Sequence, residues 1–187
     1  MESLRDIDQQ LFLFLNNLGT ETWDPFWLII TGKWYSIPLY AILLFLIYRK
    51  FGPKNTLIIL VFVAALIAST DQLANVFKHG FQRLRPCGEP AVMAKARFIA
   101  ARCGHYGYFS AHAASSMGLA IFVGFLLKST YKYLIFALLF WSVLIGYSRI
   151  YVGVHYPGDV LSGMIIGGLL GYLFYLIYRY VLKRFTH

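Results

Sequence analysis

Charged side chains are scarce in this sequence. They make up 13% of its 187 residues, whereas a soluble domain carries about 25%. Hydrophobic residues make up 59%, and the mean hydropathy is +0.61. Residues 56–76 are apolar except near their end, and no charge lies between Asp159 and Arg179. Such runs match the roughly 20 residues that a helix needs to cross a bilayer. The composition therefore excludes a soluble fold and predicts one membrane-embedded domain over residues 1–187.

Several functional signatures are also missing. No histidines or cysteines stand at the usual spacing of zinc ligands, and no glycine-rich nucleotide loop occurs, so we expect no metal and no cofactor. The start of the chain, Met1–Asp6, is acidic and polar, which predicts no cleavable signal peptide. The net charge of +9 would suggest a nucleic-acid partner in a soluble protein. In a membrane protein it indicates orientation charge instead.

Apolar runs separated by short polar loops predict an all-α, polytopic transmembrane helical bundle. Residues 1–33 mix apolar and polar side chains, which is typical of an amphipathic helix that lies in the membrane interface. A polar loop is expected over residues 79–109. About five spans are predicted, at residues 34–48 (which could extend backwards through 26–30), 56–77, 110–127, 133–147 and 158–180.

Small residues recur every four positions in the last two predicted spans. Gly163, Gly167 and Gly171 do so in one, and Ser142 and Gly146 in the other. Because small residues at this spacing let helices approach closely in lipid, we interpret them as packing positions.

The basic residues alone do not orient the chain. Five spans would place eight basic residues and no acid on one side, and nine basic residues with all eight acids on the other. Orientation follows Lys and Arg rather than net charge, so these counts leave the question open. The group of eight consists of Arg49, Lys50, Lys54, Lys128, Lys132, Arg179, Lys183 and Arg184.

The two cysteines, Cys87 and Cys103, both fall in the 79–109 loop. A disulfide between them would require an oxidising compartment and would contribute roughly 3 kcal/mol in the chain-entropy model. Two unrelated thiols are the alternative. We therefore expect the loop outside the cytoplasm and the group of eight basic residues inside.

Polar residues gather at the span ends on the side of this loop. Lys78, Arg85 and Arg149 are three cations without an equal set of acids beside them. An Arg fork matches phosphate oxygens, and Lys acts as a point charge. Ser110 stands at an expected helix start, where its hydroxyl and free backbone N–H groups favour an anion. The pattern predicts a phosphate-binding site.

Two histidines could supply the chemistry at that site. His155 and Asp159 are four residues apart, a spacing that sets them on one face if the last helix begins early. Asp159 could then hold one imidazole nitrogen and leave the other free to attack. His112, from a different span, could donate the proton that phosphoester cleavage requires.

Order and spacing of these residues resemble the type 2 phosphatidic acid phosphatases. The first motif of that family is matched by Lys78 and Arg85-Pro86, which six residues separate. The third motif is matched by Ser148-Arg149, His155 and Asp159, with five and then three residues between them. The second motif, Pro-Ser-Gly-His, is represented by 109–112, which keeps only Ser110 and His112. The resemblance spans residues 50–180.

What the resemblance implies is a metal-independent lipid phosphatase that forms a phosphohistidine. His155 would attack phosphorus, Asp159 would orient it, and His112 would protonate the leaving oxygen. The residues that would hold the phosphoryl oxygens are Lys78, Arg85, Ser110 and Arg149.

Other readings and the substrate stay open. A phospholipid transporter is the non-enzyme alternative, and a vanadate-dependent haloperoxidase shares the motifs. Candidate substrates are undecaprenyl diphosphate, which we expect first, and phosphatidic acid, phosphatidylglycerol phosphate and lipid A phosphates. The expected location is a bacterial cytoplasmic (inner) membrane with the site facing the periplasm or exterior, in an undefined oligomeric state. Further loop cations that could bind a second phosphate or simply be solvated are Arg83, Lys95, Arg97 and Arg102.

Overall fold

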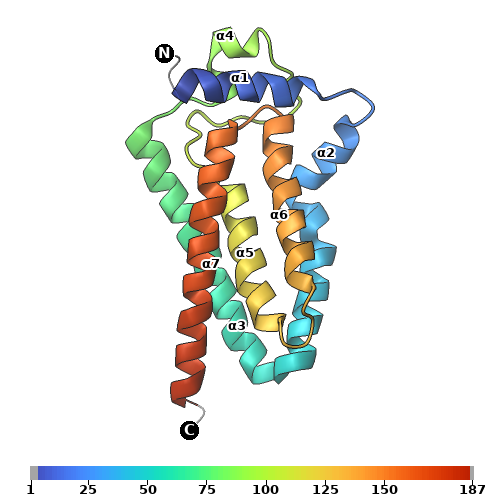
Figure 1. Cartoon of the computed structure of the whole chain (residues 1–187), viewed down its shortest axis with the longest axis vertical. Helices are drawn as coiled ribbons and strands as arrows, with labels where there is room; N and C mark the ends of the chain where they lie inside the picture. The colour runs from blue at the N-terminus through green and yellow to red at the C-terminus, as the bar shows by residue number, and fades with distance from the viewer. Residues whose placement is uncertain (1–3, 186–187) are drawn as a thin grey trace.

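The computed structural model describes residues 4–185, and the regular elements of that range are all helices. Figure 1 shows α3, α5, α6 and α7 as an upright bundle, with α1 lying across its upper end. The predicted all-α bundle is confirmed. The elements are α1 (Leu4–Asn17), α2 (Asp24–Thr31), η1 (Lys33–Ser36), α3 (Ile37–Phe81), η2 (Pro86–Gly88), α4 (Pro90–Met93), α5 (Ala111–Leu127), α6 (Leu134–Tyr151) and α7 (Pro157–Phe185).

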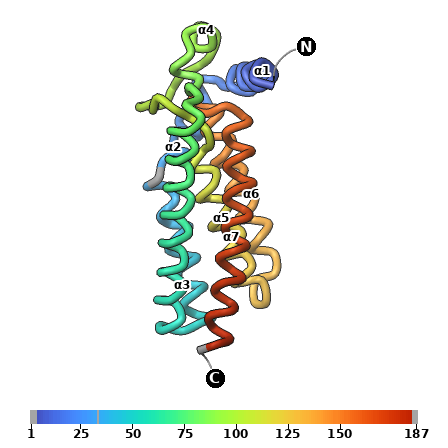
Figure 2. The backbone as a smooth tube through the Cα atoms, turned by 90° about the vertical axis from the view of Figure 1, so that its left-hand side faces the viewer, coloured from blue at the N-terminus to red at the C-terminus, as the bar shows by residue number. Residues whose placement is uncertain are grey.

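Helix α3 contains both of the first two predicted spans. The chain bends at Gly52, whose φ of 71° and ψ of 175° lie outside the helical region, and a glycine has no Cβ to oppose that conformation. Pro53 then suits the first turn of the second arm, where its missing N–H leaves no helical bond unmade. Figures 1 and 2 show α3 running down the bundle and returning beside it. The two arms with α5, α6 and α7 give the five expected crossings.

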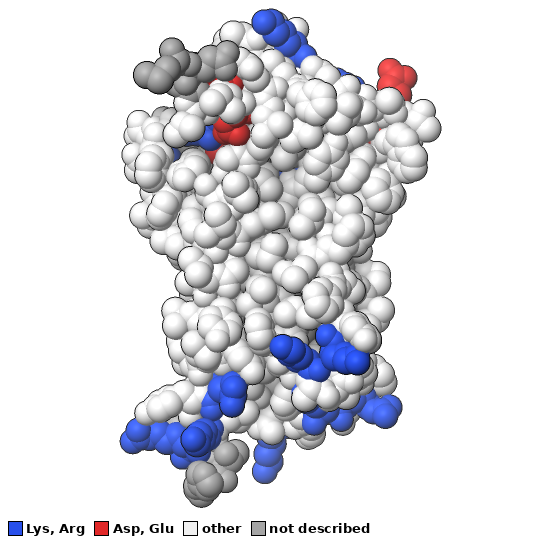
Figure 3. All heavy atoms as spheres, in the orientation of Figure 1, with Lys and Arg blue, Asp and Glu red and all other residues white. Residues whose placement is uncertain are grey.

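Among the described residues, three helical segments are long and apolar enough to cross a membrane, and α5 is a shorter apolar helix. The three are Trp34–Phe81, Leu134–Tyr151 and Pro157–Arg184. The outer faces of these helices are apolar: Leu57, Phe136 and Leu169 are exposed by 66%, 65% and 68%. Figure 3 shows an uncharged band across the middle of the molecule, with Lys and Arg gathered at its lower end. A surface of this kind fits contact with lipid.

Helix α5 is the centre of the bundle, because α3, α6 and α7 all pack on it. The glycines of α7 face it closely: a Cβ at Gly167 would overlap the carbonyl oxygen of Ala114, and one at Gly171 would meet that of Gly118. On the α6 side the hydroxyls of Ser116 and Ser142 lie 2.9 Å apart. The interpretation of these small residues as packing positions is confirmed.

The N-terminal segment forms two helices rather than the single one expected over residues 1–33, of which 1–3 lie outside the described residues. Helix α1 is amphipathic, as predicted, and its exposed stripe is apolar. That stripe consists of Leu4, Ile7, Leu11 and Phe14. Some of its polar side chains turn toward the protein: the fully buried Asn16 donates from Nδ2 to the carbonyls of Ile150 and Tyr151 at 3.1 and 2.9 Å.

Helix α2 packs against α6 rather than extending the first arm of α3. The ring of Trp27 stacks on Tyr151 with 5.2 Å between ring centroids. The chain leaves this helix through Gly32 in an extended conformation before it enters η1. Helix α2 thereby becomes one wall at the upper end of the bundle.

Candidate active site

The turn between α6 and α7 presents His155. The backbone N–H groups of Val154 and His155 both donate to the carbonyl of Arg149, at 3.1 and 3.3 Å, so the chain wraps around the end of α6. Helix α7 begins at Pro157, a residue suited to a first helical turn. Asp159 therefore falls in the first turn of α7, beside His155.

His155 and Asp159 form a hydrogen-bonded pair, although His155 precedes the helix. Nδ1 of His155 lies 3.3 Å from Oδ2 of Asp159, and the same oxygen accepts the N–H of Tyr156 at 3.1 Å. Because a carboxylate can only accept, Nδ1 carries the proton and Nε2 holds the lone pair. The structure thus brings the predicted nucleophile and its orienting acid together.

The pair is removed from solvent. His155 is 2% exposed and Asp159 is fully buried. Burial lowers the pKa of His155 to about 4; the hydrogen bond and charge of Asp159 oppose this, and the charges of Arg85 and Arg149 add to it. At neutral pH the imidazole is therefore uncharged, which is the form that can act as a nucleophile.

Three cations converge near this pair. Arg85, in the loop after α3, donates from Nε to the carbonyl of Tyr106 at 2.9 Å. Arg149 on α6 donates from Nη1 to the hydroxyl of Thr31, and its buried Nε has no hydrogen-bond partner. Lys78 on α3 lies close enough to Arg85 and Arg149 for their like charges to repel. A buried guanidinium nitrogen that lacks an acceptor, within a group of like charges, fits an anion such as phosphate.

Ser110 ties the loop to both α5 and α7. Its Oγ caps α5 by accepting the N–H of Ala113 at 3.5 Å, and its own N–H donates to the carbonyl of Asp159 at 2.9 Å. The capping bond does not use the hydroxyl hydrogen of Ser110. The side chain is fully buried, so the predicted phosphate ligand stands directly between two helix starts.

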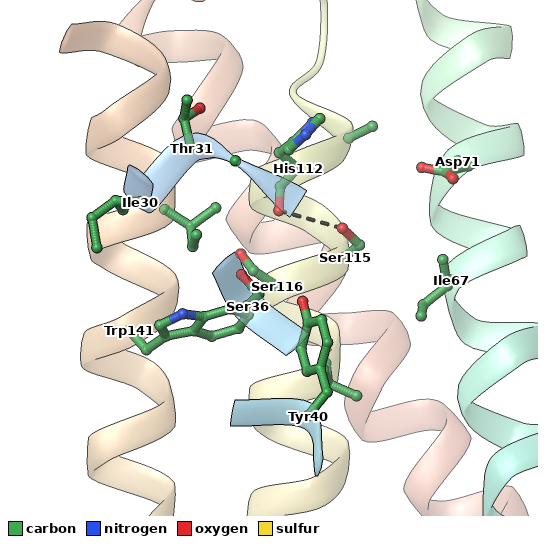
Figure 4. A pocket seen from close by; sticks show the side chains of 14 residues that line it. Ile30, Thr31, Ser36, Tyr40, Ile67, Asp71, His112, Ser115, Ser116 and Trp141 are labelled. Carbon is green, nitrogen blue, oxygen red and sulfur yellow. Dashed lines mark hydrogen bonds between the residues drawn. The ribbon is translucent and has the colours of Figure 1, made fainter. Parts of the chain in front are cut away.

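His112 lines a neighbouring cavity of about 230 Å³. Figure 4 shows its ring at the upper end of this cavity near Thr31, with Asp71 across from it on α3. Thr31 is also the partner of Arg149, so the cavity shares a wall with the cation group. His155 and Asp159 are not among the described residues that line it. The lining residues are Ile30, Thr31, Gly32, Ser36, Tyr40, Ile67, Asp71, Ala111, His112, Ser115, Ser116, Leu119, Trp141 and Ile145.

Two residues that the sequence did not assign surround Asp159. Arg83 donates from Nη1 to Oδ1 of Asp159 at 3.0 Å and from Nη2 to Oδ2 of Asp8 at 2.6 Å. Arg83 is therefore held by two acids rather than solvated. Arg97 is paired in a similar way with Asp24 at 2.8 Å. No single-sequence signal links Asp8 to Arg83, because 75 residues separate them.

The cysteines of the loop lie together in the structure. Cys87 and Cys103 are joined, with their Cα atoms 6.6 Å apart, a separation that a disulfide can span. Cys87 follows Arg85 by two residues, and a Cβ on Gly104 would lie 3.5 Å from the Arg85 guanidinium. The two chain segments joined by the cysteines therefore flank Arg85.

A metal site is not visible in the described part of the chain. Within residues 4–185 no group of three or more His, Cys, Asp or Glu side chains could hold a metal ion. The side chains that do converge are cations, which suit an anionic substrate. The expected independence of metals stays a prediction.

A profile of the PAP2 superfamily matches residues 56–183, which include all the predicted phosphate-binding and catalytic residues. The chain belongs to the PAP2 superfamily. The resemblance drawn from the three motifs is confirmed.

PAP2 relatives match nearly the whole chain. Lipid A 4'-phosphatases from Bacteroides thetaiotaomicron and Porphyromonas gingivalis are 39% and 33% identical to it, over 95% and 98% of this chain and 79% and 78% of theirs. An undecaprenyl-diphosphatase from Sulfolobus acidocaldarius is 28% identical over 87% of this chain and 67% of its own.

A solved PAP2 structure shares the fold. The crystal structure of a transmembrane PAP2 type phosphatidylglycerolphosphate phosphatase from Bacillus subtilis matches with a TM-score of 0.76 and 19% identity, over 99% of this chain and 90% of that one. This PAP2 protein is a membrane-embedded lipid phosphatase.

Proposed function

We propose that the enzyme removes a phosphate monoester from a lipid A-type glycolipid, in which the phosphate is attached to an acylated glucosamine disaccharide. The observation that carries this proposal is the cavity beside His112. Hydroxyl groups and the carboxylate of Asp71 line it, and none of the described lining residues is Lys or Arg. Such groups can hydrogen-bond sugar hydroxyls and amides on the leaving-group side of the phosphate.

Undecaprenyl diphosphate, the first expectation from sequence, fits this cavity less well. Its leaving group carries a second phosphate, and no Lys or Arg lies among the described lining residues to bind it. Sequence similarity also favours the lipid A substrate over undecaprenyl diphosphate. Two lipid A 4'-phosphatases are 39% and 33% identical to the chain, whereas the undecaprenyl-diphosphatase is 28% identical.

The first chemical step uses the buried pair. Nε2 of His155 attacks phosphorus, the bond from phosphorus to the sugar oxygen breaks, and His112 gives that oxygen its proton. Asp159 stabilises the positive charge that develops on the imidazole. Lys78, Arg85 and Arg149 neutralise the phosphoryl oxygens in the transition state, which a metal ion would do in other phosphatases.

The second step releases phosphate. His112, now neutral, takes a proton from a water molecule as that water attacks the phosphohistidine. The P–N bond breaks, inorganic phosphate leaves, and His155 returns to its neutral state. One residue thus acts as acid in the first step and as base in the second.

We further propose that the site faces the periplasm in the bacterial cytoplasmic membrane. The eight basic residues at the end opposite to the site support this, since Lys and Arg collect at cytoplasmic loops. The cysteine pair in the 79–109 loop supports it too, because disulfides persist in oxidising compartments.

Assays of purified protein on a panel of lipid phosphates test the substrate. We expect kcat/KM to be highest for the lipid A 4'-phosphate, with no loss on addition of a chelator. Asp71→Asn should lower kcat/KM for that glycolipid and leave p-nitrophenyl phosphate hydrolysis little changed. A preference for undecaprenyl diphosphate or phosphatidic acid, or equal losses on both substrates in Asp71→Asn, would contradict the proposal.

A further inference from the structure

Helix α1 contacts the first turn of α7 through one carboxylate. Oδ1 of Asp8 accepts the N–H of Gly158 at 2.7 Å, a group that has no helical partner because it lies at the start of α7. Oδ2 of the same side chain accepts from Arg83 at 2.6 Å. Asp8 thus holds the backbone next to Asp159 with one oxygen and the neighbouring cation with the other.

These bonds form a closed ring around the acid of the active site. Arg83 bridges Asp8 and Asp159, at 2.6 and 3.0 Å, and Gly158 joins Asp159 covalently to the backbone that Asp8 holds. The guanidinium of Arg83 also lies 4.4 Å from the centroid of the Tyr156 ring. A planar fork held at two nitrogens and stacked on a ring has little freedom to move.

The same helix supports this ring by packing. Phe12 lies one turn after Asp8, is fully buried, and meets the Tyr156 ring edge-on with 5.4 Å between centroids. Tyr156 stands between His155 and Pro157 in the chain. Contacts from α1 therefore reach both sides of the segment that carries His155 and Asp159.

Both oxygens of Asp159 are consequently assigned. Oδ1 faces Arg83, and Oδ2 faces His155 and the N–H of Tyr156. Without Arg83, a carboxylate with no exposed surface would retain an oxygen without a partner, which is costly in a buried site. Rotation of the carboxylate to relieve this would weaken its bond to His155.

We propose that Arg83 and Asp8 are positioning residues, which hold Asp159 and through it His155 in the reactive orientation. The inference rests on the proposed function, in which His155 is the nucleophile. Under this proposal, helix α1 supports the catalytic residues as well as lying in the membrane interface.

The positioning role separates effects on kcat from effects on KM. Arg83 contacts Asp159 and Asp8 and is not among the residues proposed to hold the phosphoryl oxygens. Its loss should therefore slow the chemical step and leave substrate binding close to that of the wild type.

The test measures kcat and KM separately for the full chain in detergent, with p-nitrophenyl phosphate as probe. Arg83→Gln should lower kcat roughly 10–100-fold, as is typical when a partner that orients a functional histidine is removed, and should change KM little. Arg83→Lys retains the charge but not the planar fork, so kcat should recover only in part. Asp8→Asn should also lower kcat, and should add little to Arg83→Gln.

The ion pair of Arg97 with Asp24 supplies the matched control. It also joins the N-terminal segment to the 79–109 loop, with side-chain exposures of 25% and 18% against 20% and 15% for Arg83 and Asp8, but it does not contact Asp159. Asp24→Asn should therefore leave kcat close to the wild-type value. A wild-type kcat in Arg83→Gln, or fully additive effects of Arg83→Gln and Asp8→Asn, would overturn the positioning role.

Trapping of the covalent intermediate separates this inference from the proposed function. If the wild type carries phosphate on His155 and Arg83→Gln forms it equally fast, the positioning role is wrong and the proposed function stands. If the wild type carries no phosphate on His155, both are overturned.

Discussion

At the scale of single residues, two histidines occupy different environments. His155 lies in a turn, is 2% exposed and donates to a buried carboxylate. His112 lies on α5 and lines a cavity shared with hydroxyl groups. One environment suits a neutral nucleophile and the other suits contact with a leaving group.

This difference predicts that the two histidines fail differently when they are removed. General acid catalysis contributes roughly 10²–10⁴-fold when the leaving oxygen is basic. His112→Ala should therefore lose most of its activity on a lipid phosphomonoester, whose alkoxide needs the proton. The same variant should still form the phosphohistidine readily from p-nitrophenyl phosphate, whose phenolate leaves unaided, although the second step would be slowed for both substrates.

Single-turnover rates of leaving-group release from both substrates on wild type and His112→Ala check this, because they report the first step alone. His155→Ala is the matched comparison, because loss of the nucleophile should abolish release from both substrates. Equal losses of the first-step rate on both substrates in His112→Ala would refute its role as general acid.

At the scale of elements, the 79–109 loop carries Arg83 and Arg85 to the start of α7. Short pieces, η2 and α4, and the joined cysteines organise it. A polar loop of this length would otherwise be free to move. The cross-link therefore fixes the two segments that flank Arg85.

The disulfide gives a prediction at this scale. Protein isolated without reductant should yield one peptide pair linked through Cys87 and Cys103 in non-reducing mass mapping. Replacement of both cysteines by serine should lower stability by roughly 3 kcal/mol in the chain-entropy model. Two free thiols in the isolated protein would refute the link.

The sequence predicted the helices of the bundle well, because long apolar runs and small-residue spacing are local patterns. Helices α5, α6 and α7 begin within one residue of the predicted spans. It also paired His155 with Asp159, which are four residues apart. The two helices of the N-terminal segment were not separated, although Gly19 lies in the turn between them and Pro25 in the first turn of α2.

The surroundings of Asp159 could not be predicted. Asp8 is 75 residues from Arg83 and 150 from Gly158, so only the folded chain brings them together. In the sequence of an amphipathic helix, Asp8 and Asn16 would be expected on the solvated face, whereas in the structure both side chains point toward the protein. The cavity at His112 draws on four helices and is equally invisible in one sequence.

At the scale of the whole molecule, charge is distributed unevenly along the bundle axis. Lys and Arg gather at the lower end in Figure 3, and acidic residues appear at the upper end. Lys78, Arg85 and Arg149 at the upper end belong to the proposed phosphate site. Without them the basic residues of the lower end are in excess, so we predict that the end with the active site lies outside the cytoplasm.

Labelling of intact cells with a membrane-impermeant thiol reagent tests the orientation. Lys95→Cys, in the exposed part of the loop, should react, and Thr130→Cys, between α5 and α6, should react only after the membrane is permeabilised. Both positions are exposed in the structure, so permeabilised cells provide the control. Reaction at position 130 but not at position 95 in intact cells would reverse the proposed topology.

The most direct test concerns the covalent intermediate itself. Purified wild type is mixed with p-nitrophenyl phosphate, quenched rapidly without acid because phosphohistidine is acid-labile, and mapped by mass spectrometry. We predict phosphate on the peptide that contains His155, at Nε2, and its complete absence in His155→Ala. Phosphate on another residue, or turnover by His155→Ala at the wild-type rate, would contradict nucleophilic attack by His155.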